Sequence, residues 1–401
     1  MPSRQPSLLH AVVAAAALLL VVHGLGRFIF TPLMPLLVND GQLSTSQGAA
    51  LASWNYLGYL LGALAAIRWH QPQQIQRSIP VALALHCLTL LGLAITDYLP
   101  FITLLRLGNG ISNGLIFVMV PALLMEWLAA RQRIGLSGLI YLGVGSGLLL
   151  SGVLSHPPGV SLANASRWWP AALLSLPLAL WGGWLMLRLC VDAPGTSKDD
   201  NAPARSAPLL DARTRPLFLA YAGAGMGYIL PMTFLPMIAS IQLGSSHPLV
   251  QQSWLIVAAA TLPAAWLWNH LGIRLGDRTA LLLNYATQLT SVLAALALPA
   301  SIGIMLCSLL MGSSFLGAVL LTQRLGRSLQ PHQGPRLSAA LIALYSVTQL
   351  LGPWLAREWL NHGGTLPETL WLGAGALAWA LIWTWRTGHA NRQQGPSGKA
   401  P

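Results

Sequence analysis

Residues 8–38 read LLHAVVAAAALLLVVHGLGRFIFTPLMPLLV, an apolar stretch with one arginine, Arg27, near its middle. About 20 apolar residues suffice for a helix to cross a bilayer, so this stretch is long enough to span one. A charged side chain at such a depth is costly, and it is tolerated where it faces the protein interior or a water-filled cavity. Arg27 is therefore a candidate substrate contact. The alternative is that it pairs with a carbonyl or an acid and only locks helices together.

The composition places most of the protein surface in lipid. Charged residues make up 8% of the 401 residues and hydrophobic residues 54%, whereas an average soluble domain is about 25% charged. The net charge of +12 comes from basic residues that occur singly or in pairs between apolar segments, which argues against a nucleic-acid surface. We therefore expect a membrane protein whose partners are the lipid bilayer and a small-molecule substrate, with no nucleic acid.

Twelve apolar segments follow one another along the chain, with short polar breaks between them. The weakest division lies between the ninth and tenth segments, where Pro299 supports a break because proline cannot continue a helix cleanly. The sequence predicts an all-α membrane protein with twelve transmembrane helices. The segments cover residues 8–38, 48–67, 79–95, 100–124, 134–154, 169–189, 216–241, 249–271, 280–298, 301–321, 337–360 and 370–385.

The longest polar break, residues 191–215, is rich in proline, alanine, serine and aspartate and has the composition of a linker. It separates six segments from six. We therefore predict an N-terminal six-helix bundle at residues 8–190, a C-terminal six-helix bundle at residues 216–386 and a tail at residues 387–401. Two six-helix halves around a central cavity are the layout of a transporter built from parallel repeats.

The basic residues predict the orientation. If the N-terminus is cytoplasmic, eighteen Lys and Arg residues fall on the inner side and two, Arg167 and Arg357, on the outer side. This matches the positive-inside rule and places the linker, the tail and both termini in the cytoplasm. The N-terminal stretch has no clear A-x-A cleavage site, so we expect it to be retained. We also expect a monomer.

The fourth segment carries Arg106, Asn109, Asn113 and Phe117 at spacings of three and four, which place them on one helix face. Such a face will not point at lipid. Either it lines a cavity, with Arg106 in binding or coupling, or it forms hydrogen bonds between helices. Glycine pairs four residues apart, such as Gly58 and Gly62, predict close helix packing.

Other segments carry further candidates for a substrate-binding or gating surface. A mixed aromatic and amide lining suits small organic substrates, although any single one of these residues can instead serve packing or the membrane interface. The candidates are Asn55, Tyr59, Tyr141, Tyr228, Phe315, Tyr345 and Gln349.

No acid falls at mid-depth in any predicted segment, and Glu126 at the inner end of the fourth comes closest. Cation-exporting proton antiporters usually need such an acid, which trades a proton for the charge of the substrate. Its absence, together with Arg27 and Arg106, favours neutral or anionic substrates. If protons are coupled, His23, His86 and Glu126 are the candidate carriers, although a histidine on an apolar helix can also be a packing residue.

Two motifs carry a resemblance to a known family. The run Gly24–Phe28 is followed by Thr31, Pro32 and Pro35, and Gly227-Tyr228 is followed by the run Thr233–Pro236. Both resemble the YbfB/YjiJ-type branch of the major facilitator superfamily. The resemblance spans essentially residues 8–385, and it implies the major facilitator fold and secondary transport in a bacterial inner (plasma) membrane.

The resemblance also implies a cytoplasmic latch. The loop GIRLGDRTA in the second half keeps Asp277 and Arg278 of the superfamily motif, whereas the equivalent loop of the first half lacks the acid. The glycine-rich run YLGVGSGLLLSG resembles the fifth-helix motif of antiporters without its usual Gly-Pro pair. This gives some support to export.

Nothing in the sequence indicates an enzyme or a cofactor. There is no Walker loop, no Ser-His-Asp constellation and no metal spacing, so we expect neither a catalytic nor a metal site. We predict a secondary active transporter that moves a small organic solute by alternating access, with proton coupling left open. The alternatives are proton-coupled efflux of amphipathic drugs or metabolites and, more remotely, a membrane sensor without transport.

Overall fold

The computed structural model describes residues 6–66, 68–69, 71–189, 208–330 and 334–387, and within these ranges the chain is helical, with no β-strand. Most of the expected linker and tail falls in residues 190–207 and 388–401, outside the described residues. The same holds for several basic residues that entered the orientation argument. These are Arg4, Lys198, Arg205, Arg392 and Lys399.

Nine helical segments in the described part of the chain are long and apolar enough to cross a membrane. The all-helical, membrane-type fold is thereby confirmed. The other three predicted segments also form helices, α3, α12 and α13, and the count of twelve spans stays a prediction. The nine cover Leu8–Asn39, Pro72–Leu93, Leu99–Ala129, Leu136–Leu154, Asn164–Leu187, Arg215–Leu243, Leu249–Leu275, Asp277–Ala297 and Ala300–Leu329.

The contacts divide the chain into two compact units. Unit 1 comprises Met1–Asp199 and Gly244–Ala259, and unit 2 comprises Asp200–Leu243 and Ala260–Pro401. The elements of unit 1 are α1 (Leu8–Leu19), η1 (Leu20–Phe28), α2 (Phe30–Asn39), α3 (Thr45–Ala66), α4 (Pro72–Leu93), α5 (Leu99–Ala129), η2 (Ile134–Tyr141), α6 (Leu142–Leu154), η3 (Asn164–Trp168) and α7 (Trp169–Leu187). Those that begin in unit 2 are α8 (Arg215–Leu243), α10 (Asp277–Ala297), α11 (Ala300–Leu329), α12 (Gly334–Asn361), η5 (Pro367–Thr369) and α13 (Leu370–Arg386), and α9 (Leu249–Leu275) is divided between the units.

Glycines set the packing of α3 against α5 in unit 1. A Cβ atom at Gly58 would collide with the backbone carbonyl of Leu107 and lie 2.9 Å from the backbone nitrogen of Ile111, and one at Gly114 would collide with the carbonyl of Tyr59 and lie 2.7 Å from the nitrogen of Ala63. No side chain larger than hydrogen fits between backbones at this distance, which is how membrane helices gain contact without a hydrophobic drive. The structure confirms the close packing predicted for these glycines.

The first span is not a regular α-helix. Between α1 and α2, residues Leu20–Phe28 form the π-helix η1, in which the hydrogen bonds run to the fifth residue back. Ile29 N–H, for example, donates to the carbonyl of Gly24 over 2.9 Å. π-Helical turns are rare and are common at functional sites. This one contains Arg27 and His23.

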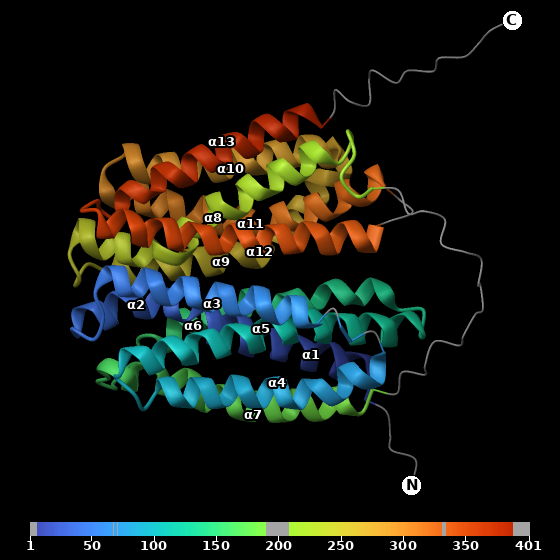
Figure 1. Ribbon diagram of the computed structural model, residues 1–401, viewed down its shortest axis with the longest axis horizontal. Helices are drawn as coiled ribbons and strands as arrows, with labels where there is room; N and C mark the ends of the chain where they lie inside the picture. The colour runs from blue at the N-terminus through green and yellow to red at the C-terminus, as the bar shows by residue number, and fades with distance from the viewer. Residues whose placement is uncertain (1–5, 67, 70, 190–207, 331–333, 388–401) are drawn as a thin grey trace, which may run out of the picture. The chain divides into compact units, whose positions relative to one another are not determined.

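Unit 2 is built around α8, which contacts α11, α12 and α13, while α10 packs against α11 and α13 (Figure 1). Of the 29 residues of α8, nearly all from Pro216 to Ala239 are buried. An apolar helix that is buried all round is central to a bundle. Its aromatic residues Tyr221 and Tyr228 therefore meet side chains of the helices that cover it.

Candidate functional site

Arg27 lies inside unit 1 among aromatic rings. Only 4% of the residue is exposed, and its guanidinium carbon is 4.5 Å from the ring centre of Tyr56, 4.6 Å from Tyr59 and 5.3 Å from Phe28. Ring faces attract a cation through their quadrupole, and the attraction grows when water is absent. The rings therefore stabilise the charge of Arg27 without cancelling it.

Arg106 is buried even more completely, with 1% of the residue exposed. Its Nη1 donates to the carbonyl of Gly26 over 3.0 Å. Its guanidinium carbon lies 4.6 Å from the ring centre of Phe30 and 5.6 Å from that of Trp168. Arg106 thus ties α5 to a carbonyl of the π-helix, one residue before Arg27.

Asn113 holds the other end of η1. Its Nδ2 donates to the carbonyl of Val22 over 2.9 Å, and its Oδ1 lies 3.0 Å from Nδ1 of His23. The imidazole of His23 also stacks on Phe117, with the ring centres 4.5 Å apart. The backbone of η1 is therefore held by Arg106 and Asn113, two of the four residues predicted to share one face of the fourth segment.

Asn109, another residue of that face, connects α5 to α3 and α4. Its Nδ2 donates to Oγ1 of Thr89 over 3.2 Å, and Nδ2 of Asn55 lies 3.4 Å from its Oδ1. His86 hydrogen-bonds to Oγ of Ser112 over 3.1 Å. The structure thus brings Arg27, His23, Asn55, Tyr59, His86, Arg106, Asn109 and Asn113 into one buried region of unit 1.

The charge of this region is one-sided. Arg27 and Arg106 are buried, yet no Asp or Glu side chain is buried among the described residues. A buried cation is normally paired or hydrogen-bonded to offset its lost hydration. Here carbonyls, amides and ring faces do so, and the net positive charge remains.

Two of the predicted site residues of unit 1 lie apart from this region. Tyr141, at the end of η2, is 40% exposed, and its ring centre lies 6.2 Å from that of Phe117. Glu126 is partly exposed in the last turn of α5, three residues before that helix ends.

In unit 2 the predicted aromatic residues form a stacked column. Tyr345 of α12 lies between two tyrosines of α8, 4.3 Å from Tyr221 and 5.3 Å from Tyr228, measured between ring centres. Phe315 of α11 stacks on Tyr228 at 6.0 Å. Gln349 Nε2 donates to the Tyr228 hydroxyl over 2.7 Å. We call these five residues the aromatic column.

The two residues predicted as a latch make separate contacts within unit 2. Asp277, at the start of α10, forms an ion pair with Arg324 of α11 at 3.0 Å. Arg324 also donates to Oδ1 of Asn269 over 2.6 Å. Arg278 instead donates to the carbonyls of Thr384 and Trp385 at the end of α13. Each of the two latch residues therefore joins α10 to a different helix.

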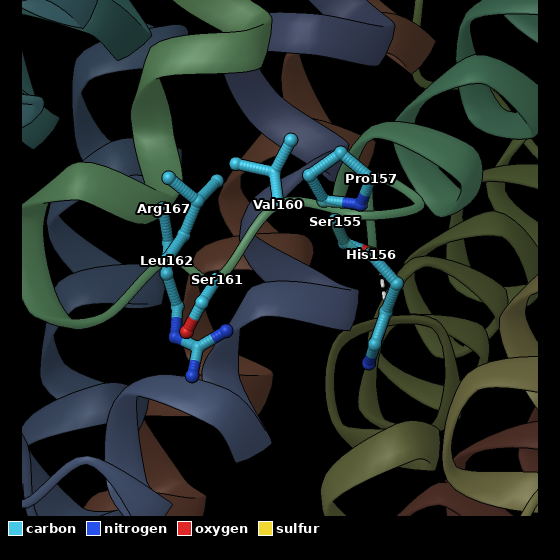
Figure 2. Close-up of a pocket in the computed structure, with 7 residues that line it drawn as sticks. All are labelled: Ser155, His156, Pro157, Val160, Ser161, Leu162 and Arg167. Carbon is cyan, nitrogen blue, oxygen red and sulfur yellow. Dashed lines mark hydrogen bonds between the residues drawn. The ribbon is translucent and has the colours of Figure 1, made fainter.

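A second polar group of unit 1 lies in the connections between its helices, just after α2 and just before α7. Arg167 binds Asp40 through two hydrogen bonds, of 2.5 and 2.7 Å. The hydrogen bond from Arg167 lowers the pKa of Asp40 from its usual value. Beside this pair is a pocket of about 300 Å³ (Figure 2). Its lining includes His156, whose pKa is lowered by burial and by the positive charge of Arg167.

The sequence patterns missed several residues of these groups. Tyr56 and Phe28 lie next to predicted candidates in the sequence, and a search for rings near Arg27 along the helices could have found them. Tyr221 sits seven residues, or two turns, before Tyr228 and could have been found by the same spacing. The pair of Asp40 and Arg167 carries no local signal, because 127 positions separate them. Within the described ranges, no three His, Cys, Asp or Glu side chains gather closely enough to hold a metal ion.

Comparison with solved structures identifies the fold. A D-xylose–proton symporter aligns with a TM-score of 0.70 and 15% identity, over 95% of this chain and 98% of its own. The nucleoside transporter NupG aligns at 0.67 and 13%, over 96% and 99%. A bacterial homolog of the human lysosomal transporter Spinster aligns at 0.64 and 14%, over 95% and 96%. These similarities show the fold of major facilitator transporters.

The sequence itself supplies the family. No curated protein matches the chain. A family model described as "Uncharacterised MFS-type transporter YbfB" matches residues 19–384, which include the buried Arg27 and Arg106 and the whole aromatic column. The resemblance seen in the Gly24–Phe28 and Thr233–Pro236 motifs is confirmed, and the chain belongs to the YbfB-type family of major facilitator transporters.

Proposed function

We propose that this protein is a secondary active transporter that moves a small organic solute, neutral or anionic and preferably anionic, across a bacterial inner membrane. It works by alternating access between two six-helix bundles, residues 8–190 and 216–386, with twelve spans and both termini in the cytoplasm, and it acts as a monomer. One observation carries the preference for anions. The two buried arginines of unit 1 face no buried carboxylate among the described residues.

The two arginines have different roles in this proposal. Arg27 is the solute contact, because its guanidinium lies among ring faces in a buried region of unit 1. Arg106 is a positioning residue, because it donates to the Gly26 carbonyl of η1 and is covered by Phe30. Asn113 supports the same turn through the carbonyl of Val22. Since both act on η1, they set where Arg27 lies.

The remaining candidates recognise the uncharged part of a solute. Asn55, Tyr59 and Asn109 in unit 1 and Tyr228, Phe315, Tyr345 and Gln349 in unit 2 offer amides and ring faces, the groups that line sites for small organic molecules. Tyr141, which is partly exposed, belongs to the gating part of the proposal, as do Asp277 and Arg278. Their contacts join helix ends that must move if access alternates.

Proton coupling would use His23, His86 or Glu126. His23 is the best placed, because Asn113 binds it and it lies in the same π-helix as Arg27. A proton on His23 would then repel the positive charge of Arg27, which lies within one turn of the same helix. Coupling would appear as uptake that depends on a pH gradient in proteoliposomes.

A ligand screen tests the proposal. Purified protein is heated with carboxylates, sugars and lipophilic cations, and the shift in melting temperature is measured. We expect stabilisation by one or more small carboxylates, lost in Arg27→Gln and partly kept in Arg27→Lys. Arg357→Gln is the matched control, because that side chain is 43% exposed. Stabilisation by lipophilic cations alone, or an unchanged carboxylate response in Arg27→Gln, would refute the proposal.

A further inference from the structure

Unit 1 contains a pocket that the proposed transport does not use. It is lined by the connection between α6 and η3 and by η3 itself, and we call it the α6–η3 pocket. Its volume of about 300 Å³ is at the lower end of the range for small-molecule sites. Figure 2 shows the guanidinium of Arg167 and the imidazole of His156 extending to the same side of this connection. The lining also includes the apolar side chains of Pro157, Val160 and Leu162.

Hydrogen bonds to other connections of unit 1 hold this part of the chain in place. The N–H of Asn164 donates to Oδ2 of Asp40 over 2.7 Å. The N–H of Ala165 donates to Oδ1 of Asp97 over 3.1 Å, and the same oxygen accepts from Nε2 of Gln42 over 2.7 Å. The start of η3 is therefore fixed by residues that follow α2 and by residues between α4 and α5. A pocket that is formed in advance loses less freedom when a ligand binds.

Arg167 can bind a second acceptor beside Asp40. Its two hydrogen bonds to Asp40 come from Nε and Nη2 and leave the N–H groups of Nη1. The side chain of Arg167 is 17% exposed, so a molecule in the pocket can reach it. Hydrogen bonds from a guanidinium to a carboxylate are charge-assisted and stronger than those between neutral groups.

His156 is arranged to take up a proton on the ring nitrogen that faces away from Ser155. The hydroxyl of Ser155 donates to the carbonyl of Gly152 over 2.8 Å, so its oxygen accepts from Nδ1 of His156 over 3.0 Å. Nδ1 therefore carries the hydrogen, and Nε2 has the lone pair. Burial and the positive charge of Arg167 lower the pKa of His156. A proton on Nε2 is therefore held weakly until a negative charge enters the pocket.

The other titratable groups around this connection do not supply that negative charge. Asp40 and Asp97 already accept the hydrogen bonds that fix the start of η3. The helices packed on η3, α4 and α7, contain no Asp or Glu. Tyr98 follows Asp97, and residues 244–259 of unit 1 add His247. Among the described residues, the imidazole of His156 is hydrogen-bonded to a hydroxyl and to no carboxylate.

We propose that the α6–η3 pocket binds a small aliphatic carboxylate together with a proton, with Nη1 of Arg167 and protonated Nε2 of His156 on the carboxylate oxygens. The negative charge of the carboxylate and the positive charge of the proton cancel, so the net charge of the pocket does not change. The apolar lining contacts the short alkyl chain. Because the imidazole gains a negative neighbour on binding, it takes up a proton from water, and the affinity rises as the pH falls.

Nuclear magnetic resonance of the full-length protein in an uncharged detergent, with isotope-labelled histidine, tests the proposal. The probes are propionate and its uncharged amide, propionamide, and the His156 signal is identified by its loss in His156→Gln. We expect propionate to raise the pKa of His156 and to bind about fivefold more tightly at about pH 6 than at about pH 8. Propionamide should bind weakly, with the same affinity at both pH values.

His156→Gln keeps a side chain that can hydrogen-bond to Ser155 but cannot take up the proton. Propionate binding in this variant should lose its pH dependence and weaken about fivefold at about pH 6. The matched control is His247→Gln, which should bind propionate as the wild type does. If His156→Gln cannot be purified, Arg167→Lys decides, because it keeps the charge beside Asp40 but loses the N–H groups of Nη1 and should weaken propionate binding about threefold.

Three results would overturn the proposal. These are equal propionate affinity at the two pH values, a His156 signal that propionate does not move, and unchanged propionate binding in His156→Gln or, in its place, Arg167→Lys. The proposal does not rest on the proposed function, because the pocket is formed without the solute contact Arg27. Arg27→Gln should leave the response of the His156 signal intact, so failure of one proposal can be told from failure of the other.

Discussion

The interiors of the two units hold polar groups of different kinds. In unit 1 the buried polar set includes Arg27, Arg106, His23 and His86. In the described part of unit 2 it consists of hydroxyls and amides, with no charged side chain. Where unit 1 surrounds a cation with rings, unit 2 stacks rings on one another.

Under the proposed function, this difference would give the recognition of a solute's charge to unit 1. A cation buried among rings and carbonyls responds strongly to an anion, because little water is present to screen it. A stack of tyrosines with a glutamine can recognise shape and hydrogen bonds, but it does not distinguish an acid from its amide by charge. Mutations in unit 1 should therefore change the selectivity for charged over neutral solutes. Mutations in unit 2 should change the affinity for both kinds of solute.

The largest effect should come from Arg106→Ala. This change removes the donor to the Gly26 carbonyl and leaves a cavity beside Phe30, so we expect a loss of about 3 kcal/mol in stability. Urea unfolding of the purified protein measures it. The counterpart in unit 2, Gln349→Ala, should cost about 1 kcal/mol. Equal losses would mean that the buried charge of unit 1 plays no special part.

Arg27→Gln should change selectivity more than stability. We expect the affinity for a carboxylate to fall at least tenfold, about 1.4 kcal/mol, while the affinity for the matching amide hardly changes. Isothermal titration with an acid–amide pair found in the ligand screen measures both. Tyr345→Leu in unit 2 should weaken the binding of the acid and of the amide alike. If that variant lost affinity for the acid alone, the proposed difference between the two units would be wrong.

Tyr228→Phe tests the polar side of the aromatic column. It removes the hydroxyl that accepts from Gln349 over 2.7 Å but keeps the ring that stacks on Tyr345. The expected loss of stability is about 1 kcal/mol, and the ratio of acid to amide binding should not move. The same titrations and unfolding curves provide the measurement, and Tyr228→Leu adds the cost of losing the stacked ring.

The smallest effect concerns pH at the outer pair of unit 1. Because the pKa of Asp40 is lowered in the folded state, its contribution to stability is present above the ordinary value of 3.8 and is lost as the pH falls through the lower folded value. Arg167→Gln should reduce this pH dependence, leaving the part due to the hydrogen bond from the Asn164 N–H, and lower stability by under about 1 kcal/mol. Melting temperatures measured from about pH 3 to about pH 7, a range that reaches below the ordinary pKa of aspartate, show whether the two curves converge in acid.

A suitable control for that pH series is Glu368→Gln in unit 2. The pKa of Glu368 is also lowered, by a hydrogen bond from the Thr365 N–H, but this side chain is exposed. Its removal should leave the melting curve nearly unchanged at every pH. A larger effect at Glu368 than at Arg167 would contradict the assignment of the outer ion pair as a structural contact.

Much of the fold could be predicted from the sequence because lipid imposes a simple rule. Every spanning backbone must satisfy its own hydrogen bonds, so apolar stretches of sufficient length become helices. Hydropathy predicts which stretches become helices, but not whether each N–H bonds to the fourth or to the fifth residue back. The π-helix at Leu20–Phe28 could therefore not be predicted from the sequence. The glycines Gly24 and Gly26 were visible, but their partners, Gly147 and His86, lie far away in the sequence.

The candidate site, like the fold, could be predicted from the sequence only in part. Residues on one helix could be grouped by spacing, as with Arg106, Asn109 and Asn113, and the structure places all three against neighbouring helices through side-chain hydrogen bonds. Groupings that join different helices could not be derived from spacing. The column formed by Tyr221, Tyr345 and Tyr228 depends on how α8 and α12 pack, which periodicity alone does not give.

The position of Arg27 has a consequence for how the chain is made. The rings of Tyr56 and Tyr59, which cover its guanidinium, belong to α3 and are synthesised about thirty residues later. Until they emerge from the ribosome, the first span carries an uncovered cation that lipid does not accept. The nascent first helix should therefore remain beside the insertion machinery until α3 arrives, so that the two enter the bilayer as a pair.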